Sequence, residues 1–325
     1  MIRPTRQTIF SFTAAILLGC LGLETVSAQE SLLADPIPMP TLGGKQFWAD
    51  VLLFHQWRIQ RNVFTGHHRL LDGRDFRYAS GTLASCREQI DRIRNKDNLP
   101  PMRGTAVLVL HGLFRSHSSM ESLCDYLRDQ GGYTVFNVEY PSTRCEVTEH
   151  AETLASLVEH LEGIDEIHFV GHSLGNIVIR RYLAMTESPE PLPDARIGRF
   201  VMLAPPNHGS EIATALADYA VFEAVAGKAG QQLGAEWPWL QARLAVPVCE
   251  FGIIAGGLGN EAGFNPLLPG DDDGTVTVAG ARLDGARDFV LLPVLHSAIM
   301  SDRRAQEQTL HFLRHGRFST EKETR

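Results

Sequence analysis

The chemically most informative residues form the motif Gly171-His172-Ser173-Leu174-Gly175. A predicted strand at 166–170 precedes the motif, and a run with helical spacing of apolar residues follows it at 174–185. In this context G-x-S-x-G predicts a sharp turn from a strand into a helix, which lifts the serine hydroxyl above the end of the sheet. Glycine is needed on both sides because a Cβ there would collide with a neighbouring strand or helix. We therefore predict that Ser173 is a nucleophile beside the positive end of a helix.

A serine hydroxyl is a weak nucleophile until a base takes its proton. His296 is the candidate base because it ends the apolar run 289–295, which places its imidazole at the end of a predicted strand. A carboxylate earlier in the chain would hold the correct tautomer and stabilise the imidazolium. Asp273, which begins the sequence DGTV, is the predicted acid, and its neighbours Asp271 and Asp272 are expected to stay solvated.

The aspartate triplet 271–273 has an alternative interpretation as a calcium site, because Ca²⁺ prefers carboxylate ligands. The triplet lacks the regular spacing and the terminal glutamate of an EF-hand loop. The cysteines and histidines show no spacing that indicates zinc. We expect no metal site, with calcium as the alternative.

Acyl transfer also needs hydrogen-bond donors for the oxyanion that develops on the substrate. Backbone amides suit this role because they are fixed before the reaction starts. The first predicted donor is the amide of Leu174, directly after the nucleophile. The second is the amide of Leu113, in the sequence His111-Gly112-Leu113-Phe114 that follows the first apolar strand. Gly112 would allow a tight turn there, and an ordinary strand-ending turn is the alternative.

The elements that must position these residues follow from hydrophobic patterning. Apolar runs without polar alternation predict the strands of a parallel sheet buried on both faces, and the runs with helical spacing between them predict crossover connections. The predicted strands are 105–110, 133–138, 166–170, 200–203, 248–254 and 289–292, and the predicted helices are 118–130, 149–161 and 174–185. The segment 210–245 interrupts this order and predicts a helical, lid-like insertion over one edge of the sheet.

The N-terminus has the order basic, apolar, small that is typical of an export signal. Arg3 and Arg6 precede the uncharged run 9–23, and the sequence Val26-Ser27-Ala28 offers a cleavage site. We predict a signal peptide at residues 1–28, and with it secretion or a place in the periplasm or cell envelope. A retained membrane anchor is one alternative. A lipoprotein acylated at Cys20, in a sequence that resembles a bacterial lipobox, is the other.

The rest of the chain is expected to comprise a leader at 29–45, a pre-region at 46–103, the α/β domain at 104–315 and a polar tail at 316–325. The pre-region has many aromatic residues next to arginines. Packing of these aromatic residues on the main domain is the expectation, and a binding surface is the alternative.

Export would place four cysteines in an oxidising compartment, where disulfides persist. They are Cys86, Cys124, Cys145 and Cys249, and four cysteines allow three full pairings. The pair Cys124–Cys145 is favoured because these residues flank one predicted strand, and four buried thiols are the alternative.

Composition excludes several classes of protein. The 325 residues are 44% hydrophobic and 21% charged, as in ordinary globular proteins. The net charge of −8 repels phosphate backbones, so we expect no nucleic-acid binding.

Together these residues resemble the α/β-hydrolase superfamily, and within it the secreted bacterial lipases and esterases. The resemblance covers residues 104–315 and includes the order Ser, Asp, His. It rests on HGL at 111–113, GHSLG at 171–175, APPNHGS at 204–210, DGTV at 273–276 and LH at 295–296.

The resemblance implies an eight-stranded core, ester hydrolysis through an acyl-enzyme, an ester or lipid substrate, and no organic cofactor. It is compatible with peripheral contact with a lipid surface and leaves the oligomeric state open. It also implies a substrate pocket shaped by His111, Phe114, His172, Asn207 and His208. A lipase or esterase is therefore the predicted function. An acyltransferase and a non-catalytic envelope binding protein stay as alternatives, because a fold alone does not fix the reaction.

Overall fold

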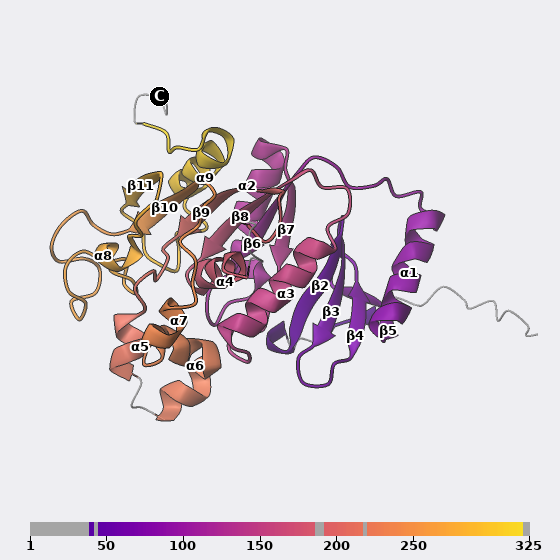
Figure 1. Cartoon of the computed structure of the whole chain (residues 1–325), viewed down its shortest axis with the longest axis horizontal. Helices are drawn as coiled ribbons and strands as arrows, with labels where there is room; N and C mark the ends of the chain where they lie inside the picture. The colour runs from indigo at the N-terminus through magenta and orange to yellow at the C-terminus, as the bar shows by residue number, and fades with distance from the viewer. Residues whose placement is uncertain (1–38, 42–44, 186–191, 217–219, 321–325) are drawn as a thin grey trace, which may run out of the picture. The chain divides into compact units, whose positions relative to one another are not determined.

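The computed structural model describes residues 39–41, 45–185, 192–216 and 220–320. Its centre is a six-stranded sheet in the order β11-β10-β9-β8-β6-β7, in which every neighbouring pair is parallel (Figure 1). The strands are β6 (Thr105–Leu110), β7 (Thr134–Val138), β8 (Glu166–His172), β9 (Ile197–Leu203), β10 (Phe251–Gly256) and β11 (Asp288–Leu292). Each of the six predicted strands is present. The predicted signal peptide and Cys20 lie outside the described residues.

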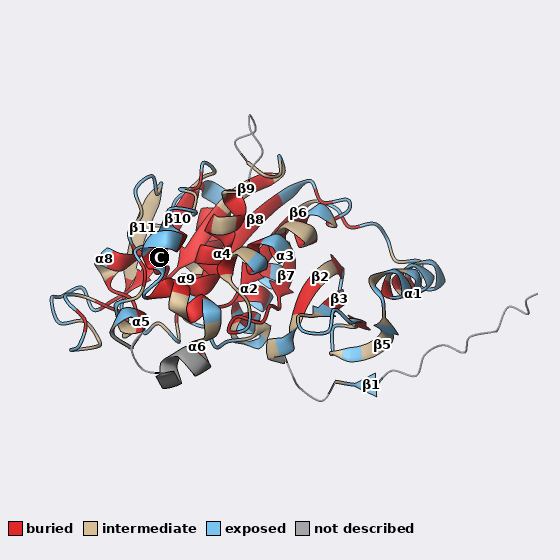
Figure 2. Cartoon of the chain, turned by 60° about the horizontal axis from the view of Figure 1, so that its bottom comes forward, coloured by how far each residue is buried: buried red, intermediate tan, exposed pale blue. Residues whose placement is uncertain are grey.

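Helices cover both faces of the parallel sheet, as predicted. They are α2 (Glu121–Gly131) and α9 (Arg303–His315) on one face, and α3 (Val147–Glu159) and α4 (Leu174–Leu183) on the other. In strand β6, Val107 and Val109 join the apolar cluster of the first face, whereas Leu108 and Leu110 join that of the second. Both faces being buried explains why the strand sequence is apolar throughout. Figure 2 shows the central strands buried and the outer sides of the helices exposed.

The resemblance implies an eight-stranded core, and this expectation is wrong: in the described residues the central sheet has six strands. The N-terminal strands pair antiparallel with one another, in the order β1-β5-β4-β3-β2, and form a separate sheet. They are β1 (Met39–Pro40), β2 (Trp48–Phe54), β3 (Trp57–Asn62), β4 (His68–Leu71) and β5 (Phe76–Gly81), and α1 (Leu83–Lys96) follows them. Strand β2 does not pair with β7 as a neighbouring strand. A single backbone hydrogen bond joins them, from the Asp50 amide to the carbonyl of Glu139, directly after β7, at 2.9 Å.

The N-terminal sheet shares its core with the main domain. Leu53, Phe54 and Ile59 belong to the same buried cluster as Leu154 and Leu157 of α3. The aromatic and aliphatic residues of this segment therefore contribute to packing.

The segment that interrupts the alternation is helical, in agreement with the prediction. It contains α5 (Glu211–Leu216), α6 (Ala220–Leu233) and α7 (Trp237–Gln241). The Ser210 amide donates to the Leu233 carbonyl at 2.8 Å, which closes the base of the insertion. The Val147 amide donates to Oε1 of the buried Gln232 at 2.9 Å, which ties α6 to the start of α3.

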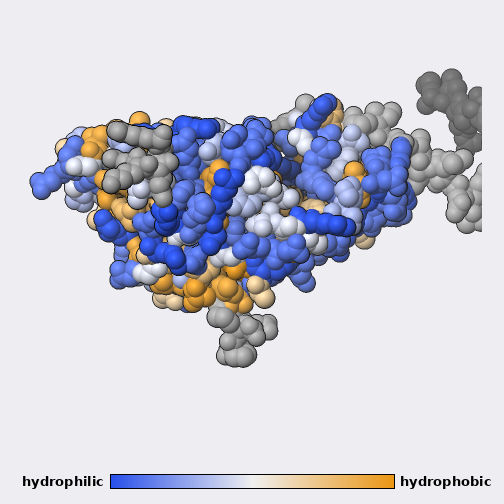
Figure 3. All heavy atoms as spheres, turned by 90° about the horizontal axis from the view of Figure 1, so that it is seen from above, coloured by the Kyte–Doolittle hydropathy of each residue, from blue (hydrophilic) through white to orange (hydrophobic). Residues whose placement is uncertain are grey.

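The remaining short elements are the 3₁₀ helices η1 (Lys45–Phe47) and η2 (His117–Met120), and the helix α8 (Val278–Ala281). No helix in the described ranges has the length and apolar character to cross a membrane. From above, the surface is largely hydrophilic and its hydrophobic areas are confined to smaller groups (Figure 3).

The favoured disulfide between Cys124 and Cys145 is wrong: both residues are free thiols, as are Cys86 and Cys249. Cys124 is buried in α2, in the cluster on one face of the sheet. Cys145 precedes α3, which covers the opposite face. The two residues flank one strand in the sequence, but the sheet separates them.

Candidate active site

The predicted nucleophile occupies the junction of a strand and a helix. Strand β8 ends at His172, α4 begins at Leu174, and Ser173 between them has φ 52° and ψ −121°. A non-glycine residue with positive φ is strained, and such strain is typical of a nucleophile at this turn. The Ser173 amide donates to the Leu203 carbonyl at 3.0 Å, which fixes the turn to the end of β9.

The two glycines of the motif are required by close packing. A Cβ on Gly171 would lie 2.8 Å from the backbone nitrogen of Asn176, and a Cβ on Gly175 would lie 2.5 Å from the Leu110 carbonyl oxygen. Both contacts are with backbone atoms, which cannot move aside easily. The Asn176 side chain, which the sequence analysis did not single out, donates to the carbonyls of Ser173 and Leu203 at 3.1 and 3.0 Å. It therefore braces the turn from the helix side.

The predicted base and acid contact each other directly. His296 follows β11, and its Nδ1 lies 2.7 Å from Oδ2 of Asp273. The other carboxylate oxygen of Asp273 accepts the amides of Thr275 and Val276 at 3.0 and 2.7 Å. The backbones are also joined, because the His296 amide donates to the Asp273 carbonyl at 2.8 Å. This arrangement fixes the carboxylate, and with it the orientation of the imidazole.

The serine turn and the histidine loop meet through His172. Its Nε2 donates to the His296 carbonyl at 3.0 Å, and the two imidazole rings are 4.8 Å apart. Ser173 is 9% exposed, and within the described residues its hydroxyl forms no hydrogen bond. The hydrogen bond between Ser173 and His296 is thus not formed here. Such bonds are often long in free enzymes and tighten when substrate binds.

The three aspartates of the triplet have different partners. Asp271 accepts the amides of Leu258 and Gly259 at 2.7 and 2.8 Å. Asp272 accepts the amide of Gly274 at 2.6 Å and is fully buried, so the prediction that it stays solvated is wrong. Its burial follows from the tight turn, whose amides need an acceptor. The triplet does not converge on one point as a calcium site would require, and the described residues contain no group of three metal ligands.

The predicted oxyanion loop lies against the serine turn. A Cβ on Gly112 would lie 3.0 Å from the Cβ of Ser173 and 2.9 Å from Nδ1 of His172. Within the described part of the chain, the Leu113 amide donates to no other group. Phe114 has φ 61° and is half-exposed. A close-packed glycine with a free amide after it is what an oxyanion loop requires.

The remaining pocket residues lie in different surroundings. Asn207 is buried, accepts from Nη1 of Arg180 at 3.0 Å and donates to the Ala281 carbonyl at 2.8 Å. These bonds join the end of β9 to α4 and α8. His208 is exposed, whereas His111 is fully buried.

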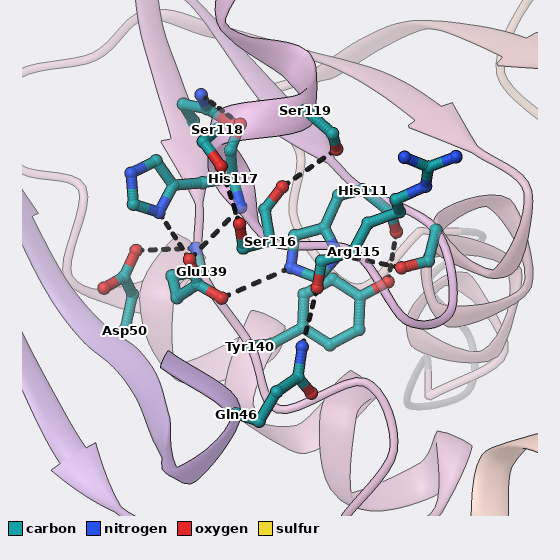
Figure 4. A network of polar contacts seen from close by, with 12 residues as sticks. Gln46, Asp50, His111, Arg115, Ser116, His117, Ser118, Ser119, Glu139 and Tyr140 are labelled. Carbon is teal, nitrogen blue, oxygen red and sulfur yellow. Dashed lines mark hydrogen bonds and ion pairs between the residues drawn. The ribbon is translucent and has the colours of Figure 1, made fainter. Parts of the chain in front are cut away.

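A buried polar network that the sequence analysis missed surrounds His111 (Figure 4). It includes Glu139 at the end of β7, His117 of η2, Tyr140, and Asp50 of β2. The only signal in the sequence is a glutamate directly after an apolar strand, where a turn residue is the ordinary interpretation.

Comparison with known proteins agrees with the fold. The family model described as "Alpha/beta hydrolase family" matches residues 107–313. The mature Bacillus licheniformis lipase BlEst2 has a similar structure, with a TM-score of 0.51 and 18% identity over 64% of this chain and 90% of that chain.

Two further similar structures have lower scores. The product of gene lin2722 from Listeria innocua has a TM-score of 0.46 and 15% identity over 67% of this chain and 96% of that one. The metagenomic carboxyl esterase MGS0156 has a TM-score of 0.47 and 20% identity over 60% of this chain and 65% of that one. A search of curated proteins finds no match. Since the family model spans well over half of the residues, this chain belongs to the α/β-hydrolase family.

Proposed function

We propose that this protein is a serine hydrolase that cleaves carboxylic esters, as a lipase or esterase does. The observation that carries the proposal is the 2.7 Å hydrogen bond between Asp273 and His296, in a loop that His172 holds against the Ser173 turn. The family and the similarity in fold to a lipase support it. An acid, a histidine and a strained serine at one edge of a parallel sheet are the parts that acyl transfer needs.

The proposed reaction has two halves. Ser173 Oγ attacks the ester carbonyl carbon while Nε2 of His296 takes the hydroxyl proton, and the amides of Leu113 and Leu174 stabilise the oxyanion. Collapse of the intermediate breaks the bond to the alcohol, which leaves with the proton from His296. Water then attacks the acyl-enzyme in the same way, releases the acid and restores the serine. Asp273 stabilises the imidazolium in both halves.

A p-nitrophenyl ester series of increasing acyl length tests the reaction and the substrate class together. We expect turnover by the wild type, and loss of turnover in Ser173→Ala with an unchanged unfolding midpoint. Ser80→Ala, at an exposed residue of β5, is the control and should turn over normally. Turnover by Ser173→Ala would show that Ser173 is not the nucleophile. Product analysis with added alcohols separates a hydrolase, which yields free acid, from an acyltransferase, which yields new ester.

Export is part of the proposal, on the strength of the signal-like sequence at 1–28. Expression of the full chain in a bacterial host, followed by N-terminal mass spectrometry, tests it. We expect a mature chain that begins at Gln29. A lipid-modified chain that begins at Cys20 would support the lipoprotein instead, and an intact N-terminus would support a retained anchor.

A further inference from the structure

The orientation of one peptide group decides whether the Leu113 amide can serve as an oxyanion donor. In a trans peptide the N–H and C=O point in opposite directions. Whatever fixes the Gly112 carbonyl therefore also aims the Leu113 amide. That carbonyl accepts two hydrogen bonds, from Nδ1 of His111 at 2.9 Å and from the Arg115 amide at 3.3 Å.

The other ring nitrogen of His111 faces a buried carboxylate. Nε2 of His111 lies 3.6 Å from Oε1 of Glu139, and within the described residues neither atom has a hydrogen-bond partner (Figure 4). Both side chains are almost fully buried. The distance is that of an ion pair and is slightly too long for a hydrogen bond. Two buried, unpaired atoms facing each other are costly unless a proton lies between them.

Glu139 is held in place from several sides. Its Oε2 accepts the His117 amide at 3.1 Å and contacts Nδ1 of His117. Its own amide donates to Oδ2 of Asp50 at 2.8 Å, and its carbonyl accepts the Asp50 amide at 2.9 Å. Burial raises the pKa of Glu139, but its interactions with His111 and His117 outweigh this and lower the pKa to about 2. The carboxylate is thus ionised and fixed, with Oε1 directed at His111.

Tyr140 fixes the position of His111 by stacking on its ring and by a hydrogen bond to its backbone. Its ring stacks on that of His111, with centroids 4.3 Å apart and an interplanar angle of 13°. Its hydroxyl donates to the His111 carbonyl. Packing therefore positions the His111 ring, so that Nδ1 contacts the Gly112 carbonyl and Nε2 faces Glu139.

We propose that Glu139 and His111 form a second acid–histidine pair, whose role is to position the oxyanion-hole peptide between Gly112 and Leu113. Because Nδ1 donates to Gly112, a neutral ring would turn a lone pair toward the carboxylate. A second proton on Nε2 satisfies both buried atoms and makes Nδ1–H a stronger, charge-assisted donor. That bond polarises the peptide and makes the Leu113 amide a better donor to the oxyanion. His111 and Glu139 are thus positioning residues, and their role rests on the proposed esterase function.

Two substitutions at His111 separate the roles of its two ring nitrogens. Asparagine places an amide nitrogen near the position of Nδ1, so His111→Asn keeps a donor for Gly112 and loses the contact with Glu139. Glutamine places its amide nitrogen near Nε2, so His111→Gln does the reverse. Both variants lose the stacking on Tyr140, which makes them matched controls for packing.

We expect His111→Gln to lower kcat by about 10- to 100-fold with KM within about twofold, since loss of a complete oxyanion donor costs about 10²–10³ in kcat. His111→Asn and Glu139→Gln each keep a donor for Gly112 and lose the charged contact between the two side chains, so for both we expect a smaller loss, of about fivefold. A trifluoromethyl ketone forms an oxyanion when the serine adds to it. Its inhibition constant should rise in each variant by the same factor as kcat/KM falls.

The inhibitor distinguishes positioning from simple loss of folded enzyme, because a smaller active fraction lowers kcat and leaves the inhibition constant unchanged. Equal losses in the two His111 variants, or an unchanged inhibition constant, would overturn the inference. If His111→Gln does not fold, Glu139→Gln gives the same two measurements. An inactive wild type would contradict the proposed function instead, so the two failures are distinguishable.

Discussion

His172, the residue before the predicted nucleophile, donates its Nε2–H to the backbone carbonyl of His296 over 3.0 Å. Burial, and secondly the charge of His296, lower the pKa of His172 well below its ordinary value. The ring is therefore neutral, and the hydrogen bond requires its proton to be on Nε2. This bond holds the loop of the proposed base, His296, against the turn of the proposed nucleophile, Ser173.

Substitution of His172 should slow the reaction without weakening substrate binding. Glutamine can place an amide nitrogen near Nε2 and keep the bond, whereas phenylalanine keeps a ring and loses it. We expect kcat to fall about fivefold in His172→Phe and less than about twofold in His172→Gln, since one hydrogen bond contributes about 1 kcal/mol. Steady-state kinetics with a p-nitrophenyl ester measures this. Equal kcat values in the two variants would show that the bond has no positioning role.

The aspartate triplet allows the effect on kcat of one substitution to be compared at Asp273 and at Asp271. Asp273→Asn places an amide donor opposite Nδ1 of His296 and favours the wrong tautomer, so kcat should fall by about 10³ or more. Asp271→Asn changes only the turn at Leu258 and Gly259 and should lower kcat less than about threefold. The two variants are compared with the same ester. Similar losses would mean that the acid is assigned to the wrong residue.

The serine turn should depend on its glycines for stability and on its hydroxyl for activity. A Cβ on Gly175 would lie 2.5 Å from the Leu110 carbonyl oxygen, so Gly175→Ala must displace backbone. We expect Gly175→Ala to lower the free energy of unfolding by at least about 2 kcal/mol, and Ser173→Ala to change it by less than about 0.5 kcal/mol. Urea unfolding followed by circular dichroism measures both. A fully stable Gly175→Ala would contradict the close packing of the turn.

His150 should make the protein sensitive to mild acid. It is buried in α3 beside Tyr140, and burial, with the charge of His111 as second cause, lowers its pKa to about 3. In the unfolded chain the ring takes up a proton below about pH 6.5. The stability that the neutral ring contributes is thus complete above this pH and is lost progressively as the pH falls toward 3.

We expect the loss from His150 between about pH 7 and about pH 5 to be roughly 2 kcal/mol. His150→Phe keeps an aromatic ring against Tyr140 and cannot titrate, so its stability should fall less over the same interval. Urea unfolding of both proteins at the two pH values measures the difference. Identical losses would show that the ring is not kept neutral by burial.

The chemistry-bearing residues could be predicted because each lies at a local signal. Ser173 directly follows a strand, His296 ends an apolar run that contains a strand, and Asp273 begins a turn sequence. The parallel sheet was predictable for the same reason, since strands buried on both faces leave uninterrupted apolar runs.

The N-terminal sheet could not be predicted because its interior carries a polar row. Gln60 donates to Asp50 at 2.8 Å and accepts from Nε of Arg69 at 2.9 Å, and all three side chains are buried. A register shift between Asp50 and Leu52 disturbs the alternation further. The contact of Asp50 with Glu139 joins residues 89 positions apart, which no local pattern reveals. The network under the predicted oxyanion loop includes that contact, so it could not be predicted either.

Labelling with a fluorophosphonate, followed by peptide mass spectrometry, tests the central claim most directly. The reagent phosphonylates only a serine that a neighbouring base activates. We expect one adduct, on the peptide that contains Ser173, and labelling that is lost in Ser173→Ala and strongly slowed in His296→Ala. An unlabelled wild type, or an adduct on a different serine, would contradict the assignment of an activated nucleophile to this turn.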